Sequence, residues 1–223
     1  MPHQNRVTPF GTLVAVTARG SPMGNRGRLH DDGGVIRRSY QGKRWIICLL
    51  EFKDRRRAVM TPGQYTELFF LDEATAFAAG HRPCAECQRD RFEMFRQEWI
   101  RAGLDTAGMA RPSAVTIDNL LHRERVADGH KLTYSARLES LPNGTFISDE
   151  SDANLLFKNR LLRWSPTSYA SASEHLLPEP VQVLTPRPLV AVLAAGYPIG
   201  IHSSAFELAR ASEDWAPGPF EAS

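Results

Sequence analysis

The N-terminal part of the chain alternates apolar with polar residues over short runs, a pattern that predicts β-strands. Val7–Thr17 is expected to be a strand interrupted at Pro9-Phe10-Gly11. Ser21–Gly34 contains four glycines and one proline, which predicts a long loop. The apolar run Trp45–Phe52 has the length of a strand, and Arg57–Met60 is expected to pair with it across a charged turn. That pair would form a hairpin with a basic tip.

After residue 63 the spacing of the apolar residues changes to that of helices. Asp72 can cap a short Ala-rich helix, and Gly80 can end it in the left-handed conformation that glycine adopts without strain. Pro83 is expected to open a second helix, in which aromatic residues recur at helical spacing: Phe92, Phe95 and Trp99. This assignment places Cys84 and Cys87 at the start of a helix.

The C-terminal half returns to strand patterns and ends in helices. Lys131–Leu141 and Thr145–Ser148 flank Asn143-Gly144, a dipeptide that favours a tight hairpin turn. Leu161–Ser165 offers another strand, and Pro188–Ala195 has the proline start of a short helix. One or two further helical turns are expected over residues 205–211.

These elements predict an α+β fold. It would contain antiparallel strands and hairpins, two adjacent helices around a Cys-x-x-Cys motif, and a short late helix. Residues 1–104 are expected to form a basic strand region together with the segment around the Cys-x-x-Cys motif. Residues 105–223 would form a β-rich region with a C-terminal helix, packed as one unit with the first.

The composition is that of a globular chain, with 42% hydrophobic and 23% charged residues over 223 positions. No apolar run reaches the roughly 20 residues that cross a bilayer, so no membrane partner is expected. No secretory signal is readable at the N-terminus. The three cysteines are too few for a disulfide framework and suit a reducing cytoplasm.

Positive charge is concentrated near the N-terminus. Residues 1–60 hold twelve Arg or Lys against four Asp or Glu, although the whole chain carries only +2. Such an excess is typical of a surface that meets a polyanion, which makes DNA or RNA the expected partner. The candidate phosphate contacts are Arg37, Arg38, Arg44, Arg55, Arg56 and Arg57. The alternative is a coding bias toward arginine, since the chain has 23 Arg and 4 Lys, with a merely solvated face.

One segment, residues 69–90, resembles a known family. A Phe-rich strand entry is followed by a short Ala-rich helix closed by Gly80, and then by Arg82-Pro83-Cys84-x-x-Cys87 leading into another helix. This order resembles the second half of the Ada-type metal-binding domain of bacterial DNA alkylation-repair proteins. The resemblance implies zinc, contact with DNA, and Cys84 and Cys87 as the second ligand pair. The first ligand pair of that family has no counterpart, so the methyl-acceptor role is not carried over.

The chemistry of the cysteine pair independently indicates a metal. Two cysteines separated by two residues can bind one zinc ion from a single turn, and a helix N-terminus favours thiolates. Two ligands leave a tetrahedron incomplete, and His30 and His122 are the candidates to complete it. Cys48 lies in an apolar run and is interpreted as a buried, inert thiol. His81 is the nearest imidazole, but its family counterpart is an aromatic residue that binds no metal.

The sequence favours a zinc-containing nucleic-acid-binding protein with a mainly structural metal site. One alternative is a metal-dependent hydrolase acting on a nucleic acid or nucleotide, and another is a metal-stabilised interaction domain. A thioredoxin-like redox pair is disfavoured because a helix is expected before it, and a remnant that has lost its metal stays open. Catalytic residues are unknown, since no Gly-x-Ser-x-Gly, Walker loop or His-Glu-x-x-His motif occurs. The oligomeric state is also open.

Overall fold

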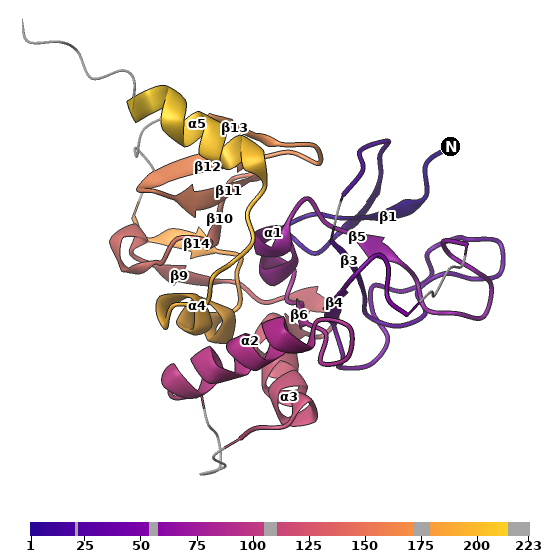
Figure 1. The fold of residues 1–223 in the computed structure, drawn as a ribbon. Coiled ribbons are helices and arrows are strands. Elements are labelled where there is room, and N and C mark those ends of the chain that lie inside the picture. Colours follow the sequence, from indigo (N-terminus) through magenta and orange to yellow (C-terminus); the bar gives the residue numbers. More distant parts are fainter. Residues whose placement is uncertain (21, 54–57, 105–110, 172–178, 214–223) are drawn as a thin grey trace, which may run out of the picture.

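The fold is α+β, as the sequence predicts, and contains two six-stranded sheets. It is seen in a computed structural model that describes residues 1–20, 22–53, 58–104, 111–171 and 179–213. The N-terminal sheet has the strand order β2-β1-β5-β3-β4-β6 and the C-terminal sheet the order β13-β12-β11-β10-β14-β9 (Figure 1). No helix in the described part of the chain combines the length and apolar character needed to cross a bilayer.

The first sheet is built from very short strands: β1 (Gln4–Val7), β2 (Leu13–Ala15), β3 (Met23–Asn25), β4 (Ile46–Cys48), β5 (Leu68–Phe69) and β6 (Arg82–Pro83). The second sheet contains β9 (Tyr134–Ala136), β10 (Phe146–Asp149), β11 (Asp152–Phe157), β12 (Arg160–Trp164), β13 (Tyr169–Ser171) and β14 (Val181–Val183). A separate two-stranded hairpin joins β7 (Val126–Ala127) to β8 (His130–Lys131). Every pairing in the second sheet is antiparallel, whereas the first sheet also has the parallel pairs β1–β5 and β4–β6.

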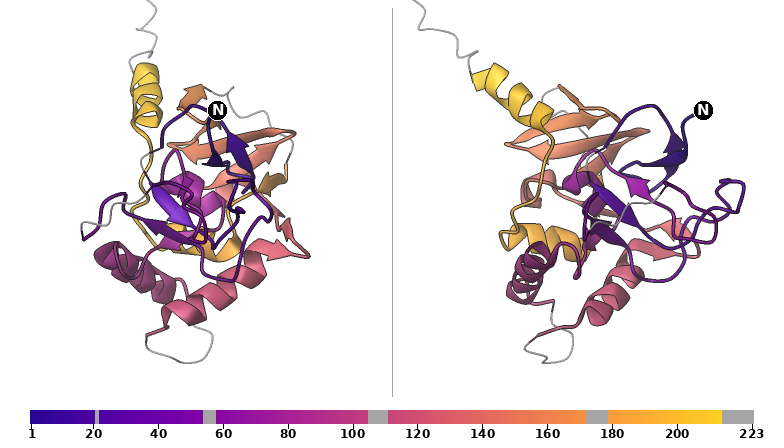
Figure 2. Two further views of the ribbon diagram at one scale, coloured as in Figure 1. Left: turned by 90° about the vertical axis from the view of Figure 1, so that its right-hand side faces the viewer. Right: turned by 45° about the vertical axis from the view of Figure 1, so that its right-hand side comes forward.

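Helices lie between and around the sheets. They are α1 (Glu73–Ala78), α2 (Arg89–Arg101), α3 (Ala114–Arg125), α4 (Arg187–Ala194) and α5 (Ser203–Glu213). Figure 1 shows α1 between the two sheets, and both views of Figure 2 keep it at the centre of the molecule. The other α-helices pack peripherally, with α2 against α4 and α5 against β13.

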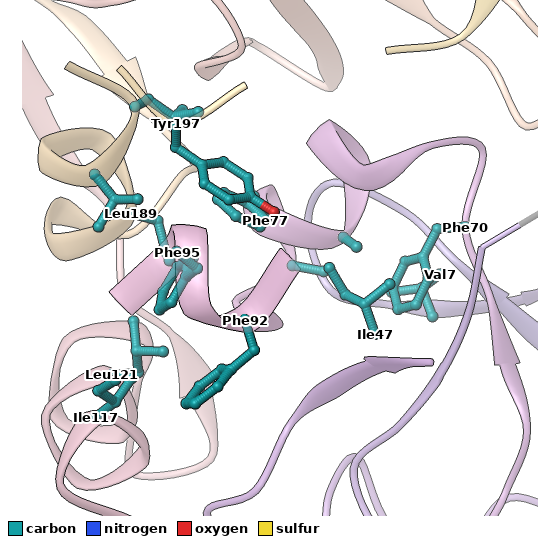
Figure 3. Packing of buried hydrophobic residues seen from close by; sticks show 14 of the residues in the cluster. Val7, Ile47, Phe70, Phe77, Phe92, Phe95, Ile117, Leu121, Leu189 and Tyr197 are labelled. Atoms are coloured by element: carbon teal, nitrogen blue, oxygen red, sulfur yellow. The ribbon is translucent and has the colours of Figure 1, made fainter. Parts of the chain in front are cut away.

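Helix α1 contributes to two hydrophobic cores at once. Phe77 belongs to the core that includes residues of α2, α3 and α4, and its ring stacks on Tyr197 at 5.3 Å between centroids (Figure 3). Ala74 and Ala78 belong instead to the core of the second sheet. All six residues of α1 are buried, because small alanines let elements approach the helix from opposite sides. The two halves of the chain are therefore packed through this one helix.

Two acidic residues at the start of α1 hold the C-terminal segment in place. Asp72 caps the helix by accepting a hydrogen bond from the Thr75 N–H at 2.8 Å. Its second oxygen accepts bonds from the Tyr169 hydroxyl at 2.7 Å and from the His202 N–H at 3.0 Å. Glu73 accepts bonds from the Tyr197 hydroxyl at 2.7 Å and from the Gly200 N–H at 2.8 Å. Both carboxylates are buried but hydrogen-bonded, so their burial costs little.

Several predicted elements are confirmed. The interrupted strand near the N-terminus is the β1–β2 hairpin, and the Asp72-capped helix ends before Gly80, whose φ is +86°. The strand predicted over residues 161–165 is β12, and the late helices are α4 and α5. The confirmed elements carry local signals that tertiary contacts do not override.

Two hairpin predictions are wrong. Strand β4 pairs with β3 and β6, while Ala58–Met60 form no strand and residues 54–57 lie outside the described part of the chain. Asn143-Gly144 does not join adjacent strands, because β10 pairs with β11 and β14. The predicted loop over residues 21–34 contains β3. Long-range pairing, which leaves no local signal, decides each of these cases.

Tyr169→Phe is expected to destabilise the protein by about 1–3 kcal/mol, because buried Asp72 would lose a hydrogen-bond donor. Urea unfolding followed by circular dichroism measures this loss. Tyr134→Phe is the matched control, since the Tyr134 hydroxyl has no hydrogen bond within the described residues, and its stability is expected to stay near that of the wild type. Equal losses in both variants would contradict the proposed role of Asp72.

Candidate metal centre

The parallel pairing of β4 with β6 brings Cys48 next to the Cys84–Cys87 segment. Ile46 lies opposite Arg82 and Ile47 opposite Pro83. The ladder extends by one more bond, from the Cys84 N–H to the Ile47 carbonyl oxygen at 2.9 Å. The Gln88 side chain donates to the same oxygen at 3.0 Å. Residues 36 positions apart in the sequence are thus held side by side.

The three cysteines form a cluster. The Sγ atoms of Cys48, Cys84 and Cys87 all lie within 4.8 Å of one another. Cys84 is buried, and the other two are half-buried. Within the described part of the chain, no other group of three or more His, Cys, Asp or Glu ligand atoms is this compact. A cluster of three thiols is therefore the strongest candidate site in the structure.

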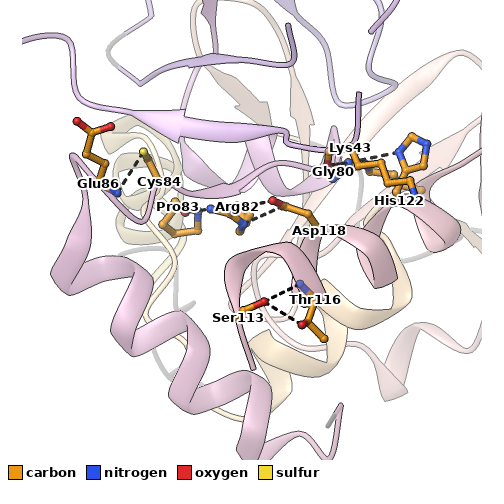
Figure 4. Close-up of polar contacts among 11 residues, drawn as sticks. Lys43, Gly80, Arg82, Pro83, Cys84, Glu86, Ser113, Thr116, Asp118 and His122 are labelled. Atoms are coloured by element: carbon orange, nitrogen blue, oxygen red, sulfur yellow. Dashed lines mark hydrogen bonds and ion pairs between the residues drawn. The ribbon is translucent and has the colours of Figure 1, made fainter. Parts of the chain in front are cut away.

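Backbone N–H groups point at two of the sulfur atoms. The Leu49 N–H donates to Cys87 Sγ at 3.4 Å. The Glu86 N–H donates to Cys84 Sγ, also at 3.4 Å (Figure 4). Such bonds stabilise a negatively charged sulfur more than a neutral thiol. Hydrogen bonds from the Cys48 and Cys87 thiols, together with bonds from the backbone N–H groups of Cys87 and Glu86, hold the pKa of Cys84 well below its ordinary value. Hydrogen bonds with Cys84 and Cys87, together with burial, raise the pKa of Cys48.

This donor set fits a thiophilic metal such as zinc. Zinc binds thiolates at about 2.3 Å in a tetrahedron, which separates the sulfurs by about 3.8 Å. The observed cluster needs only small side-chain shifts to reach that arrangement. Three thiolates account for three of four positions, so one further donor completes the shell. Hard, oxygen-preferring ions such as magnesium would not select three sulfurs.

The interpretation of Cys48 as a buried, inert thiol is wrong. Its side chain is half-buried and belongs to the cluster. The expectation that Pro83 opens a helix containing both cysteines is wrong. Pro83 belongs to β6, and Cys84 and Cys87 lie in the turn that precedes α2. The apolar neighbours of Cys48 belong to its short strand, in which Ile47 packs into the hydrophobic core and Ile46, like Cys48, lines the groove. The sequence offered one signal for its role, namely that the chain has only three cysteines.

The structure gives the predicted histidine ligands other surroundings. His30 is buried, and its Nδ1 lies 2.6 Å from the Thr66 hydroxyl. His122 lies on α3, with its ring centroid 5.4 Å from that of Tyr40 and its pKa lowered by burial and by Arg125 and Lys43. His81 is fully buried beside the rings of Trp45 and Phe70. None of the three joins the compact cysteine cluster.

Helix α3, which carries His122, has a capping signal that the sequence reading overlooked. The Ser113 hydroxyl accepts a hydrogen bond from the Thr116 N–H at 3.1 Å (Figure 4). Ile117 and Leu121 then recur at helical spacing and are buried in the core. His122 and Asp118 therefore lie on a helix that is anchored in the core.

A long groove opens beside the cysteines. It has a volume of about 1270 Å³, and all three cysteines line it together with Lys43 and Arg44. Its walls also include the exposed apolar side chains of Leu49, Leu50 and Val115. The centre is thus reachable from solvent.

The predicted phosphate-contact arginines have different surroundings. Arg38 and Arg44 are exposed, and Arg44 lines the groove. Arg37 is also exposed but pairs with Asp31 at 2.7 Å. Arg55, Arg56 and Arg57 lie outside the described residues.

A buried ion pair fixes β6 and hence Cys84. The Arg82 guanidinium donates two hydrogen bonds to Asp118 on α3, at 2.9 and 2.7 Å, and a third to the Pro83 carbonyl oxygen (Figure 4). Burial raises the pKa of Asp118, although Arg82 opposes this effect. The bidentate geometry fixes the orientation of β6 relative to α3.

The redox interpretation also changes in the structure. The helix expected before the cysteine pair is α1, although the two-residue strand β6 lies between this helix and Cys84. The stronger argument against a redox pair is the third thiol, that of Cys48. A dithiol couple needs two sulfurs, whereas three converging sulfurs are typical of metal coordination.

Comparison with known proteins gives no relative: no protein-family model, curated protein or solved structure matches this chain. The interpretation of the site therefore depends on its own chemistry.

Replacing one partner of the Arg82–Asp118 pair is expected to destabilise the protein by about 3–5 kcal/mol, because the other charge stays buried without compensation. Asp118→Leu and Arg82→Met are the single variants, and urea unfolding is the measurement. The double variant is expected to lose less than the two single losses added together. Additive losses would show that the pair does not act as a unit.

Proposed function

We propose that the chain binds zinc through Cys48, Cys84 and Cys87, and that this mainly structural centre supports a nucleic-acid-binding surface. The convergence of three Sγ atoms within 4.8 Å carries the metal proposal. The metal would join β4 to the turn before α2. These elements are too short to be stable by local hydrogen bonding alone, so a cross-link between them contributes directly to folding.

Basic residues beside the centre support the nucleic-acid part of the proposal. Lys43 and Arg44 line the same groove as the cysteines, and Arg44 is exposed. Arg38 is exposed on the segment that leads into β4, and the described part of the chain contains no ion-pair partner for it. Exposed, uncompensated guanidinium groups are suited to phosphate contacts. The resemblance of residues 69–90 to the Ada-type domain agrees with this proposal.

A metal-dependent hydrolase is the second candidate, and one observation favours it. All three cysteines line the large groove, so the fourth zinc position would face solvent and a substrate could approach it. Zinc with three protein ligands and an open position lowers the pKa of a bound water, which then serves as a nucleophile. Hydrolysis of a phosphodiester by the zinc-loaded protein, abolished by chelation, would favour this candidate over the structural centre.

The purified protein is expected to contain one zinc ion per chain, measured by atomic emission. Cobalt substitution should give sulfur-to-metal charge-transfer absorption, because thiolates are the ligands. Cys48→Ser should weaken metal binding at least about tenfold, since serine supplies no thiolate. The matched variant His122→Gln should keep its metal content, because His122 does not belong to the cluster. Wild-type protein that binds neither zinc nor cobalt would refute the metal proposal.

Oligonucleotide binding is expected to weaken steeply with salt, as measured by fluorescence anisotropy at several salt concentrations. Arg44→Gln should weaken binding and lower the slope of log K against log salt by about 1, because one phosphate contact is lost. Arg163→Gln is the control, since Arg163 is also exposed but lies on β12 of the other sheet. Absence of binding at low salt would exclude the nucleic-acid proposal while leaving the metal proposal intact.

A further inference from the structure

A second cavity, separate from the groove at the cysteines, is lined by three cationic side chains. Arg26 follows β3, Arg125 ends α3, and Lys131 ends β8. All three line a pocket of about 420 Å³ that shares no lining residue with the groove. Both arginines are buried to 2% exposure, and Lys131 is half-buried. Three elements distant in the sequence thus bring positive charges to one place.

No acidic group of the described residues lies in the pocket itself, since its lining contains no Asp or Glu. Within the described part of the chain, no carboxylate forms an ion pair with any of the three cations. Asp118 is the nearest acid that affects Arg125, but both of its oxygens are bound by Arg82. Buried charges in proteins are normally paired, so an unpaired cluster requires an explanation.

Backbone carbonyl oxygens hold the cations in position. Arg26 donates to the Gly11 oxygen at 2.8 Å, and Arg125 donates to the oxygens of Gly80 and Lys43 at 2.8 and 2.6 Å. Lys131 donates to the Ala78 oxygen. These neutral acceptors orient the side chains but do not cancel their charge. The Nε atoms of Arg26 and Arg125 are buried with no hydrogen-bond partner.

Close packing leaves Arg125 little freedom to move. Gly80 approaches the Arg125 side chain so closely that a Cβ at this position would lie 2.7 Å from Arg125 Cδ. The Trp45 ring lies against both guanidinium groups, with Arg125 Cζ 4.1 Å and Arg26 Cζ 4.9 Å from its centroid. These cation–π contacts fix the guanidinium planes. The cluster is therefore preorganised.

Lys131 shows most clearly that burying these positive charges together is unfavourable. Burial of its amino group, together with the charges of Arg26 and Arg125, lowers the pKa of Lys131 to about 7. Burial likewise lowers the pKa of Arg125 to about 9, and repulsion from Arg26 adds to that effect. An anion placed among the three groups would reverse these effects. Preorganised charges that have no acidic partner are typical of ligand sites.

The geometry points to a phosphate-binding pocket: we propose that Arg26, Arg125 and Lys131 bind the phosphate group of a ligand of about mononucleotide size. A phosphate dianion offers enough charge and acceptor oxygens for three cations, whereas a carboxylate carries one charge and two oxygens. The volume of 420 Å³ lies within the usual range of small-molecule sites. The rings of Tyr40 and Phe10 also line the pocket and offer apolar surface for the rest of the ligand.

The phosphate could belong to a free phosphate ester or to the end of a nucleic-acid strand. Calorimetric titrations of the full-length protein with inorganic phosphate, a nucleoside monophosphate, and an oligonucleotide with or without a 5′-phosphate distinguish the two. All are performed at one ionic strength. Tighter binding of the monophosphate than of inorganic phosphate assigns the site to a free ester. A preference for the 5′-phosphorylated oligonucleotide over its 5′-hydroxyl form assigns it to a strand end.

Lys131→Gln is expected to weaken binding of the phosphate probes at least about tenfold, because one charged donor is lost. Without ligand, its melting temperature should equal or exceed that of the wild type, since the variant removes a charge that burial disfavours. A purely structural lysine would show the opposite change in stability. Lys158→Gln, which removes an exposed lysine from the turn between β11 and β12, should bind as the wild type does.

Three results would overturn the proposal. The first is the absence of saturable binding for every phosphate probe. The second is equal affinity in the wild type and Lys131→Gln. The third is an equal loss of affinity in Lys131→Gln and Lys158→Gln, which would show only general attraction of anions. None of these results bears on zinc binding by the cysteines, because the two sites share no lining residue.

Discussion

The three-cysteine cluster depends on one short parallel pairing, that of β4 with β6. Register between the strands is set by Ile46 opposite Arg82 and Ile47 opposite Pro83. A shift by one residue would turn Cys48 to the other face of the sheet and remove it from Cys84. Because β6 has only two residues, its own ladder bonds cannot hold that register. The constraint therefore comes from its flanks, namely buried α1 before it and the Arg82–Asp118 pair across from it.

Helix α1 explains how a strand as short as β6 is held in one position. It contributes side chains to both main hydrophobic cores, so displacing it would expose apolar surface on two sides. Asp72 and Glu73 add hydrogen bonds to the C-terminal segment. The chain leaves α1 through Gly80, turns back beside β4 and reaches the cysteines within a few residues. Packing at the centre of the molecule thus determines the geometry of sulfur atoms near its surface.

The sequence predicted those features that local chemistry determines. Asp72 and Gly80 delimit α1 because capping and left-handed conformations have strong residue preferences. Cys84 and Cys87 were predicted as a ligand pair because only two residues separate them. Cys48 was not predicted as a ligand, because its proximity to Cys84 and Cys87 arises from a strand pairing across 36 residues that leaves no trace in local spacing. The Asn143-Gly144 hairpin failed for the same reason: β10 finds its partners elsewhere in the sheet.

The buried arginines Arg82, Arg26 and Arg125 differ in their interaction partners. Arg82 is matched by a carboxylate in bidentate geometry, and this pair serves to position a strand. Arg26 and Arg125, equally buried, donate instead to carbonyl oxygens and lie against the face of Trp45, and Arg125 also lies 3.5 Å from His122 Nδ1. If burial of cations served stability alone, both groups would be expected to have acidic partners, because an unpaired buried charge opposes folding. Arg6 is also buried and donates to carbonyl oxygens, but it does not line this pocket. The convergence of Arg26, Arg125 and Lys131 on one pocket, together with the missing carboxylates, therefore distinguishes a cluster prepared for an external anion from a structural ion pair.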